Sequence, residues 1–436
     1  MKYHTYIVGF NATHSHHVNY VSDTFPNMKP ENRWTTQKRN LAGASLTHAL
    51  HDGYTDALYA FMPVWQAQFG LSYAALAVIR ALYYATMGGL QIPADRVLRG
   101  WSPQAALILS TVVAAAGLLI MALPLGFTGL CIGLVVAGIG SSIQHPRGSM
   151  LVTHSYGKAA RGPLGIYNFA GDLGKAVLPA LVAVLLTVLA WRPLLGLMAL
   201  LGVALCFALM ALAPAVPLSG NDTEEKPAGR GRGGFRVLAM IGGLDTATRM
   251  GYLLFLPFLI QGRGGSLPTV GIALALLFIG GAFGKMTFGW LGERLGVVMT
   301  VMMAETTTAL LITATLFTPL TLTLILLPLL GIVLNGISSV LYGTVPELSD
   351  GDTGRAFAIF YTSVIGSGGI APILYGAIAD HSSQTIGLLA TAATAALIVP
   401  LILILRPHLR SQPMARDGVA RSRPRISSTT SERIAQ

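Results

Sequence analysis

Long apolar stretches dominate this chain and leave it few possible folds. Hydrophobic residues make up 53% of its 436 residues and charged residues only 11%, whereas soluble proteins contain about 25% charged residues. Each apolar stretch has about 20 residues, the length of a helix that crosses the hydrocarbon core of a bilayer. We therefore predict an all-α polytopic membrane protein with twelve transmembrane helices. The stretches lie at about 43–66, 73–92, 103–124, 128–150, 162–189, 193–215, 236–260, 268–290, 297–317, 321–345, 356–379 and 384–405.

The stretches form two sets of six around a polar, Gly- and Arg-rich segment from Pro217 to Gly234. The two halves repeat, since Pro63 and Tyr167 in the first half match Pro257 and Tyr361 in the second at the same spacing. Each half holds an even number of crossings, so both halves run through the membrane in the same direction. Parallel repeats of this kind place a substrate site between them near the bilayer midplane. We therefore expect two parallel six-helix bundles around a central cavity.

The same pattern predicts the domain organisation. Two bundles alternate with three polar segments, which we expect to be a cytoplasmic N-terminal tail, a cytoplasmic linker and a basic, disordered cytoplasmic C-terminal tail. In chain order the parts are the tail at 1–42, the first bundle at 43–216, the linker at 217–235, the second bundle at 236–406 and the tail at 407–436.

The formal net charge of +11 reflects membrane topology, and we predict no nucleic-acid partner. Outside the apolar stretches, the Lys and Arg residues fall in the tails, the linker and alternate loops, with Arg192 and Arg263 as the two exceptions. Loops rich in these residues stay on the cytoplasmic side. We therefore predict that both termini are cytoplasmic and that the protein lies in the plasma membrane, the inner membrane of a bacterium. Residues 1–41 contain no apolar signal-peptide core.

No metal site and no cofactor are predicted. Cys131 and Cys206 both lie in apolar stretches and form neither a disulfide framework nor a metal motif. His14, His16 and His17 are close together near the N-terminus, but no Cys or acidic residue beside them completes a typical zinc site.

The first apolar stretch differs from the others because four titratable side chains interrupt it: His48, His51, Asp52 and Asp56. On a helix these four and Tyr59 fall within an arc of about 140°, opposite an apolar face. Two carboxylates four residues apart in a low dielectric cannot both ionise at low cost. We predict that Asp52 or Asp56 couples transport to protons and that His48 or His51 relays the proton. The alternative is a structural His–Asp network that holds helices together.

Further polar side chains interrupt later stretches, and an unpaired charge inside a membrane costs roughly 2.5–3.5 kcal/mol even on insertion scales. We expect Asp172 to pair with Lys175 or Arg147. We expect Asp52 to pair with Lys175 or His145. Such a network suits an anionic or zwitterionic substrate, and it suits a purely structural role equally well. The residues predicted to line a substrate cavity are Tyr59, His145, Arg147, Tyr167, Asn168, Asp172, Lys175, Asp245 and Arg249, with Arg80, Lys285 and Glu305 as weaker candidates.

The loop after the eighth stretch reads GWLGERLG, from Gly289 to Gly296. This pattern, between the second and third helices of a six-helix half, resembles the signature loop of the major facilitator superfamily. The first half holds a degraded copy around Asp95. The resemblance implies that acid–Arg contacts in these loops lock the outward-facing state, and the alternative is a charged loop that only sets topology. The gating residues implied in this way are Asp95, Arg96, Arg99, Gly289, Glu293 and Arg294.

Three features within the superfamily are similar to the fosmidomycin-resistance family of drug exporters. They are the His–Asp pair followed by Pro63 and the run from Gly70 to Ser72, the segment from Gly140 to Pro146, and the segment from Phe360 to Pro372. Together they span most of the chain. By this resemblance we expect export of a small polar or drug-like molecule.

The leading hypothesis is a proton-coupled secondary transporter that works by alternating access and exports its substrate by proton antiport. Uptake of a small organic anion is the alternative, and a transporter-like membrane sensor is less favoured. An intramembrane enzyme would need an ordered nucleophile or metal constellation, which the sequence lacks, so no enzymatic activity is predicted. The expected partners are a small-molecule substrate, protons and the lipid bilayer, and the protein is expected to be a monomer.

Overall fold

The structure is a computed structural model that describes residues 30–212, 234–349 and 353–409, and the regular structure of these residues is entirely helical. The first half contains α1 (Pro30–Phe69), α2 (Tyr73–Gly89), α3 (Gln91–Val97), α4 (Pro103–Ala122), α5 (Gly126–Tyr156), the short 3-10 helix η1 (Gly157–Ala159), α6 (Arg161–Leu185) and α7 (Trp191–Leu212). The second half contains α8 (Phe235–Gln261), α9 (Leu267–Phe317), α10 (Leu320–Gly336), α11 (Ser338–Leu348), α12 (Thr353–His381), α13 (Gln384–Leu405) and η2 (Arg406–His408). The prediction of an all-α membrane protein is confirmed.

Eight helices in the described part of the chain are long and apolar enough to cross a membrane, or nine if α2 and α3, which meet at a 45° bend, form one span. One of them, α9, has 51 residues and contains two predicted crossings that meet at Gly296. This residue has a φ of 76°, a left-handed conformation that glycine adopts without strain. α1 and α8 are not among the eight, because charged side chains such as Asp52 and Arg249 lower their hydropathy. With these helices all twelve predicted crossings have a counterpart.

Most helix ends lie within a few residues of the predicted ones, but α1 begins at Pro30 rather than near residue 43. The extra turns are polar, so hydropathy gives no sign of them. They are held by hydrogen bonds instead: Gln37 Nε2 donates to the Ser155 carbonyl oxygen (2.8 Å) and Arg39 Nε to the Leu212 carbonyl oxygen (3.0 Å). Residues 1–29, 213–233 and 410–436, which contain most of the predicted tails and linker, lie outside the described residues.

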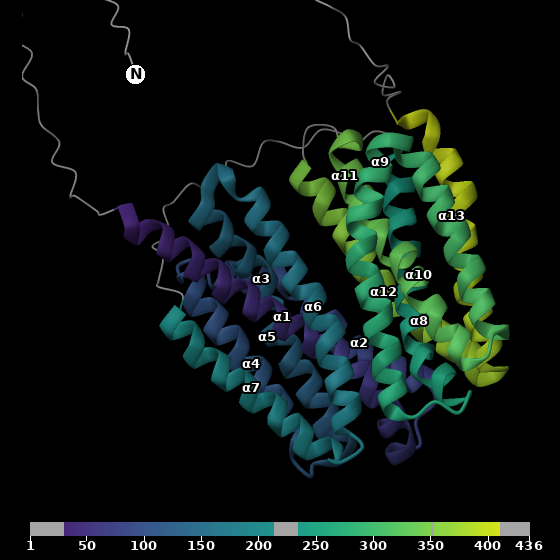
Figure 1. Cartoon of the computed structure of the whole chain (residues 1–436), viewed down its shortest axis with the longest axis horizontal. Helices are drawn as coiled ribbons and strands as arrows, with labels where there is room; N and C mark the ends of the chain where they lie inside the picture. Colours follow the sequence, from purple (N-terminus) through teal and green to yellow (C-terminus); the bar gives the residue numbers. More distant parts are fainter. Residues whose placement is uncertain (1–29, 213–233, 350–352, 410–436) are drawn as a thin grey trace, which may run out of the picture.

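The helices form two bundles, α1–α7 in purple to teal and α8–α13 in green to yellow, which converge at one end and diverge at the other (Figure 1). α2 packs against α12 and α6 against α9, so these four helices make the main contact between the bundles. Within each bundle some helices touch through glycine. A Cβ atom at Gly174 of α6 would lie 2.0 Å from the Ala49 carbonyl oxygen of α1, and one at Gly280 of α9 would lie 2.1 Å from the Pro328 carbonyl oxygen of α10.

The bundles are joined at the end that holds the α1–α2 and α12–α13 turns, which we call the closed end. The two carboxylate oxygens of Asp380 accept hydrogen bonds from the backbone N–H groups of Tyr73 (2.8 Å) and Ala74 (2.9 Å). The Tyr73 ring packs edge-on against Phe255 and Phe258, at centroid distances of 5.5 and 5.2 Å. These contacts tie the start of α2 to the second bundle. The opposite end, which holds α3 and α11, is called the far end.

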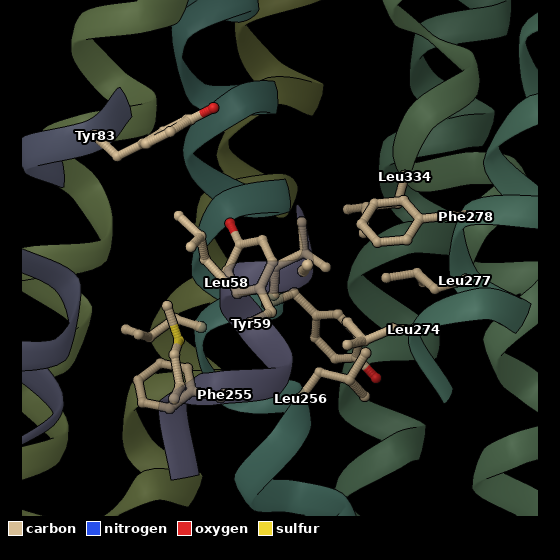
Figure 2. Packing of buried hydrophobic residues seen from close by; sticks show 14 of the residues in the cluster. Leu58, Tyr59, Tyr83, Phe255, Leu256, Leu274, Leu277, Phe278 and Leu334 are labelled. Carbon is tan, nitrogen blue, oxygen red and sulfur yellow. The ribbon is translucent and has the colours of Figure 1, made fainter. Parts of the chain in front are cut away.

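A single apolar cluster continues these contacts into the middle of the molecule. Figure 2 shows Leu58 and Tyr59 of α1 beside Phe255 and Leu256 of α8, with Leu274 of α9 next to them. All five side chains are buried. The core therefore crosses from one bundle to the other between the closed end and the polar residues of α1.

Candidate functional site

A cavity of about 520 Å³ lies between the two bundles, above this apolar floor. Gln91, Ser149 and Tyr361 extend its lining toward the far end. Helices of both bundles contribute polar side chains to it. These are Asp52, Thr55, Asp56, Arg80, Tyr84, Gln91, His145, Ser149, Asp172 and Lys175 from the first bundle and Arg249, Lys285, Asn335, Tyr342 and Tyr361 from the second. Among the charged residues, four cations face three carboxylates, so the lining has a small excess of positive charge.

Asp52 lies at the centre of one polar cluster. Its Oδ2 is 3.1 Å from Lys175 Nζ and 3.2 Å from His48 Nε2, and its Oδ1 is 3.6 Å from His145 Nε2. The expected pairing of Asp52 with Lys175 or His145 is thus present with both partners. The opposite charges of Asp52 and Lys175 reduce the cost of burying either one.

Asp56 lies on the same face of α1 but meets a different cation. Its Oδ1 is 3.9 Å from Nη2 of Arg80 in α2. Arg80 is only 7% exposed, and its guanidinium carbon lies 5.0 Å from the centre of the Tyr59 ring and 5.1 Å from that of Tyr84. None of its three guanidinium nitrogens has a hydrogen-bond partner among the described residues. A buried guanidinium with five unused N–H donors is costly unless a ligand satisfies them.

Asp172 and Lys285 connect the bundles across the cavity. Lys285 Nζ donates to Oδ1 and Oδ2 of Asp172 at 2.6 and 2.8 Å. Lys175 lies 3.8 Å from the same Oδ1, so the expected pair within α6 is also present. Asp172 therefore bridges a cation of its own helix and one of α9.

Arg249 of the second bundle also lines the cavity. Its Nη2 donates to Thr246 Oγ1 at 3.4 Å, and its Nε has no partner among the described residues. Asp245 and Glu305 are both buried, and neither lines the cavity.

Several predicted site residues lie outside the cavity lining. His51 faces the interior of the first bundle, where Nδ1 is 3.1 Å from Ser141 Oγ and Nε2 is 3.2 Å from Thr111 Oγ1. His48 stacks on Tyr167 with ring centroids 4.1 Å apart. The placements of the others are also plain: Tyr167 is buried behind His48, Tyr59 is buried beneath Arg80, and Asn168 is exposed on the outer surface of α6.

Arg147 was predicted to line the cavity, but it instead binds Asp95 in the first half's copy of the signature loop. Its Nη2 lies 2.9 Å from Asp95 Oδ1 and donates to the Asp95 carbonyl oxygen, also at 2.9 Å. The guanidinium is almost fully buried, so the side chain points from α5 toward α3 and not between the bundles. Of the two partners expected for Asp172, Lys175 is present, whereas Arg147 binds Asp95 instead.

The other predicted gating residues lie at the far end. Arg96, Arg99 and Glu293 are exposed, and the Arg294 guanidinium carbon lies 4.4 Å from the centre of the Trp290 ring. Gly289, also at this end, makes no close helix contact: the nearest atom to a Cβ there is Ser339 Oγ at 3.9 Å. The close approach of α9 and α10 occurs at Gly280 and three related glycines instead: Gly284, Gly331 and Gly336.

The sequence pattern described as Major Facilitator Superfamily matches residues 44–242 and again residues 237–430. The fosmidomycin resistance protein of Escherichia coli (strain K12) is 22% identical over 368 residues, which cover 79% of this chain and 87% of that protein.

Solved transporter structures share the fold. The inward-facing, unoccupied crystal structure of a bacterial homologue of the human lysosomal transporter Spinster superposes with a TM-score of 0.69, at 16% identity, over 88% of this chain and 98% of that one. A POT family transporter in complex with 5-aminolevulinic acid gives a TM-score of 0.70, at 12% identity, over 85% and 96% of the two chains. Two parallel bundles, a polar cavity between them and a sequence match in each half lead to one conclusion: this chain belongs to the Major Facilitator Superfamily and is a multi-pass membrane transporter, not an enzyme.

Proposed function

We propose that the protein is a proton-coupled secondary transporter that exports a small polar molecule by proton antiport, as a monomer. The two bundles rock about the cavity so that it opens to each side of the membrane in turn. Proton binding shifts such an equilibrium only if its affinity differs between the two states. A carboxylate that is enclosed in one state and hydrated in the other, as Asp52 would be, meets this condition. The name of the Escherichia coli relative supports the direction of export.

The distribution of Lys and Arg supports an orientation with both termini in the cytoplasm and the protein in the plasma membrane. In this orientation the closed end faces outward and the cavity is inward-facing. The contacts of Asp380 and Tyr73 then form the outer gate. The loops with Asp95 and Arg294 lie on the cytoplasmic side, where acid–Arg contacts would lock the outward-facing state.

The observation that carries the proposal is the Arg80 guanidinium, which is buried in the cavity with no hydrogen-bond partner among the described residues. Arg249 of the opposite bundle also has an unpartnered nitrogen and lines the same cavity. A guanidinium binds the two oxygens of a carboxylate, phosphate or phosphonate in a bidentate manner. We infer that the substrate carries an oxyanion that binds Arg80 and faces Arg249.

The contacts of His48 support Asp52 as the proton site. His48 Nδ1 lies 2.9 Å from the Tyr167 carbonyl oxygen, which only accepts, so Nδ1 carries the hydrogen. Nε2 of a neutral ring would then direct its lone pair at Asp52 Oδ2, 3.2 Å away. A proton shared between Nε2 and Oδ2 removes this repulsion. Asp52 and His48 together would bind the coupling proton, with Lys175 as the neighbouring cation.

Antiport requires that substrate and proton exclude each other. An N–H or O–H group of the substrate would donate to the Asp52 carboxylate, while the oxyanion of the same molecule binds Arg80. A proton on Asp52 removes its negative charge and turns one of its oxygens into a donor, so this contact is weakened. Substrate affinity is therefore expected to fall as the pH is lowered through the range in which Asp52 takes up its proton.

The contact between Arg80 and Asp56 favours a second candidate, proton-coupled uptake of a small organic anion. Asp56 Oδ1 lies 3.9 Å from Arg80 Nη2, and a proton on Asp56 would leave Arg80 free for an anion. Proton and anion would then bind together, as symport requires. In this case substrate affinity is expected to rise as the pH is lowered.

Transport in proteoliposomes distinguishes these functions, with labelled fosmidomycin as the probe. Under antiport an acidic vesicle interior drives accumulation, whereas under symport an acidic exterior drives it. Counterflow of the same probe without a pH gradient tests transport alone. Counterflow that persists while neither gradient drives accumulation would contradict proton coupling, and absence of counterflow would exclude this compound as a substrate.

A double variant, Asp52→Asn with Asp56→Asn, tests the coupling residues. It is expected to keep counterflow and to lose accumulation driven by a pH gradient. Glu347→Gln is the matched control, since this acid is exposed on α11 outside the cavity lining and its variant should retain both activities. Gradient-driven accumulation by the double variant would show that the coupling assignment is wrong.

A further inference from the structure

Two histidines and a carboxylate that are distant in sequence meet beside the cavity. One donor atom from each of His48, Asp52 and His145 can be chosen such that all three lie within 4.8 Å of one another. We propose that these residues form a binding site for one divalent transition-metal ion of the Zn²⁺, Ni²⁺ and Co²⁺ class. Imidazole and carboxylate are the ligands that this class of ion prefers.

Two of the separations between these ligand atoms are close to those in a coordination sphere. His48 Nε2 is 3.2 Å from Asp52 Oδ2, and His145 Nε2 is 3.6 Å from Asp52 Oδ1. An ion with metal–ligand bonds of about 2.0–2.1 Å in a tetrahedral arrangement separates its ligand atoms by about 3.3 Å. Small rotations of the side chains therefore bring three ligand atoms to bonding distance, with a fourth position left for water.

The hydrogen bond of His48 prepares its ring for a metal. Nδ1 donates to the Tyr167 carbonyl oxygen at 2.9 Å, which leaves the lone pair on Nε2, the atom that faces Asp52. Metal-binding histidines usually donate their other N–H to a carbonyl or carboxylate group in this way. Stacking on Tyr167, with centroids 4.1 Å apart, holds the ring plane in place.

A glycine leaves the space beside these atoms free. A Cβ at Gly171 of α6 would lie 2.7 Å from Asp52 Oδ2 and 2.8 Å from His48 Nε2. Any other residue at this position would fill the region next to both proposed ligand atoms. Asp52 and His145 line the cavity, so an ion from solution can reach the site.

Lys175 is the competitor for this site. Its Nζ lies 3.1 Å from Asp52 Oδ2, where its charge opposes a cation, but it also lies 3.8 Å from Asp172. A metal ion would displace the ammonium group from Asp52, and Lys175 would then pair with Asp172 alone. The ion would also occupy the carboxylate that we assign to the coupling proton. Metal binding can be measured without transport, so the two proposals are tested separately.

Titration with Co²⁺ tests the site, because its visible ligand-field absorption reports coordination by nitrogen and oxygen. The full chain is used in detergent, with His14, His16 and His17 replaced by Ala to remove the other histidine cluster. We expect one Co²⁺ per chain, displaced by Zn²⁺. His145→Gln and Gly171→Ala should each weaken binding about 10- to 100-fold, whereas Lys175→Gln should strengthen it.

His154→Ala is the matched control, since His154 lies on the same helix as His145 but is exposed, and it should bind Co²⁺ like the parent. Unchanged affinity in both His145→Gln and Gly171→Ala would overturn the proposal. Absence of Co²⁺ binding in both the parent and Lys175→Gln would also overturn it. Lys175→Gln retains all three ligands, so a folding defect in another variant does not decide the outcome.

Discussion

Lys285 of α9 donates hydrogen bonds to both carboxylate oxygens of Asp172 of α6, at 2.6 and 2.8 Å. This contact joins the two bundles at the cavity. Lys175 lies 3.8 Å from Asp172 and 3.1 Å from Asp52, so alternating charges run from α9 to the centre of α1. A change of charge at Asp52 is therefore felt, through Lys175, at the contact between the bundles.

The first prediction concerns the strength of this contact. Asp172→Asn and Lys285→Met should destabilise the protein less together than the sum of their separate effects, with a coupling of about 1 kcal/mol because Lys285 is partly exposed. The stabilities of the parent, the two single variants and the double variant are measured by thermal unfolding in detergent. The charge swap Asp172→Lys with Lys285→Asp should recover part of the loss. As a control, the effects of Asp380→Asn at the closed end and Lys285→Met on stability should simply add. Strictly additive effects of Asp172→Asn and Lys285→Met would contradict the assigned pair.

The second prediction concerns the closed end. Asp380→Ala removes the acceptors of the Tyr73 and Ala74 N–H groups, a loss of about 1–2 kcal/mol by analogy with helix caps. This corresponds to a change of roughly 5- to 30-fold in the ratio of closed to open molecules. Spin labels are attached to cysteines introduced at the exposed positions Ala67 and Ser382, after both native cysteines are replaced. The distance between the labels should then show an additional, longer population. Asp380→Asn retains one acceptor and should give an intermediate shift, and distances identical to the parent in Asp380→Ala would disprove the sealing role.

The third prediction concerns packing within the first bundle. Gly174→Ala places a Cβ where the Ala49 carbonyl oxygen lies 2.0 Å away, so α1 and α6 must separate, at a cost of about 1–3 kcal/mol. Gly165→Ala is the matched control on the same helix, since a Cβ there meets nothing within 4 Å. The control should be neutral or slightly stabilising, because alanine favours helix over glycine. Equal melting temperatures for the two variants would refute the close contact.

The fourth prediction separates stability from function at Arg80. Without ligand, Arg80→Met combined with Asp56→Asn should melt at a higher temperature than the parent, because it removes a buried guanidinium whose nitrogens have no hydrogen-bond partner among the described residues and leaves no unpaired carboxylate behind. Arg80→Met alone should raise the KM for fosmidomycin at least about tenfold, since hydrogen bonds to charged groups contribute roughly 1.5–3 kcal/mol. Arg80→Lys keeps the positive charge but not the planar guanidinium group, so its KM should lie between those of the parent and of Arg80→Met.

Arg192→Lys is the control for Arg80, because this guanidinium lies 4.6 Å from the centre of the Trp191 ring and outside the cavity lining. It should leave the KM unchanged. A normal KM in Arg80→Met, measured by counterflow, would contradict the assignment of Arg80 to the substrate oxyanion.

Periodicity and hydropathy predicted the helices and the polar face of α1, because both depend on residues near one another in sequence. They also predicted the Asp52–Lys175 pair, since few cations lie at the right depth. They failed for Arg147, which binds Asp95, and they placed Lys285 only among the weaker cavity candidates, although it lines the cavity and binds Asp172. Which neighbour a side chain meets depends on the rotation and tilt of helices that are far apart in sequence, and a single helix does not contain that information.

Arg80 shows a signal that sequence reasoning undervalued. It is the one charged residue in the stretch at 73–92, with no acid within reach on its own helix. A lone Arg in a membrane helix must find a partner on another helix or in a ligand. A lone cation of this kind is a stronger candidate for the cavity lining than Asn168, which is exposed.

The turn at Gly296 joins two crossings of the second bundle through one residue with a φ of 76°. A connection this short has no slack. The half of α9 that carries Lys285 cannot move away from the half that carries Glu305, so both must travel together when the bundles rock. We therefore expect a rocking motion that breaks the Asp172–Lys285 contact to be carried through this turn to the crossing in which Glu305 is buried.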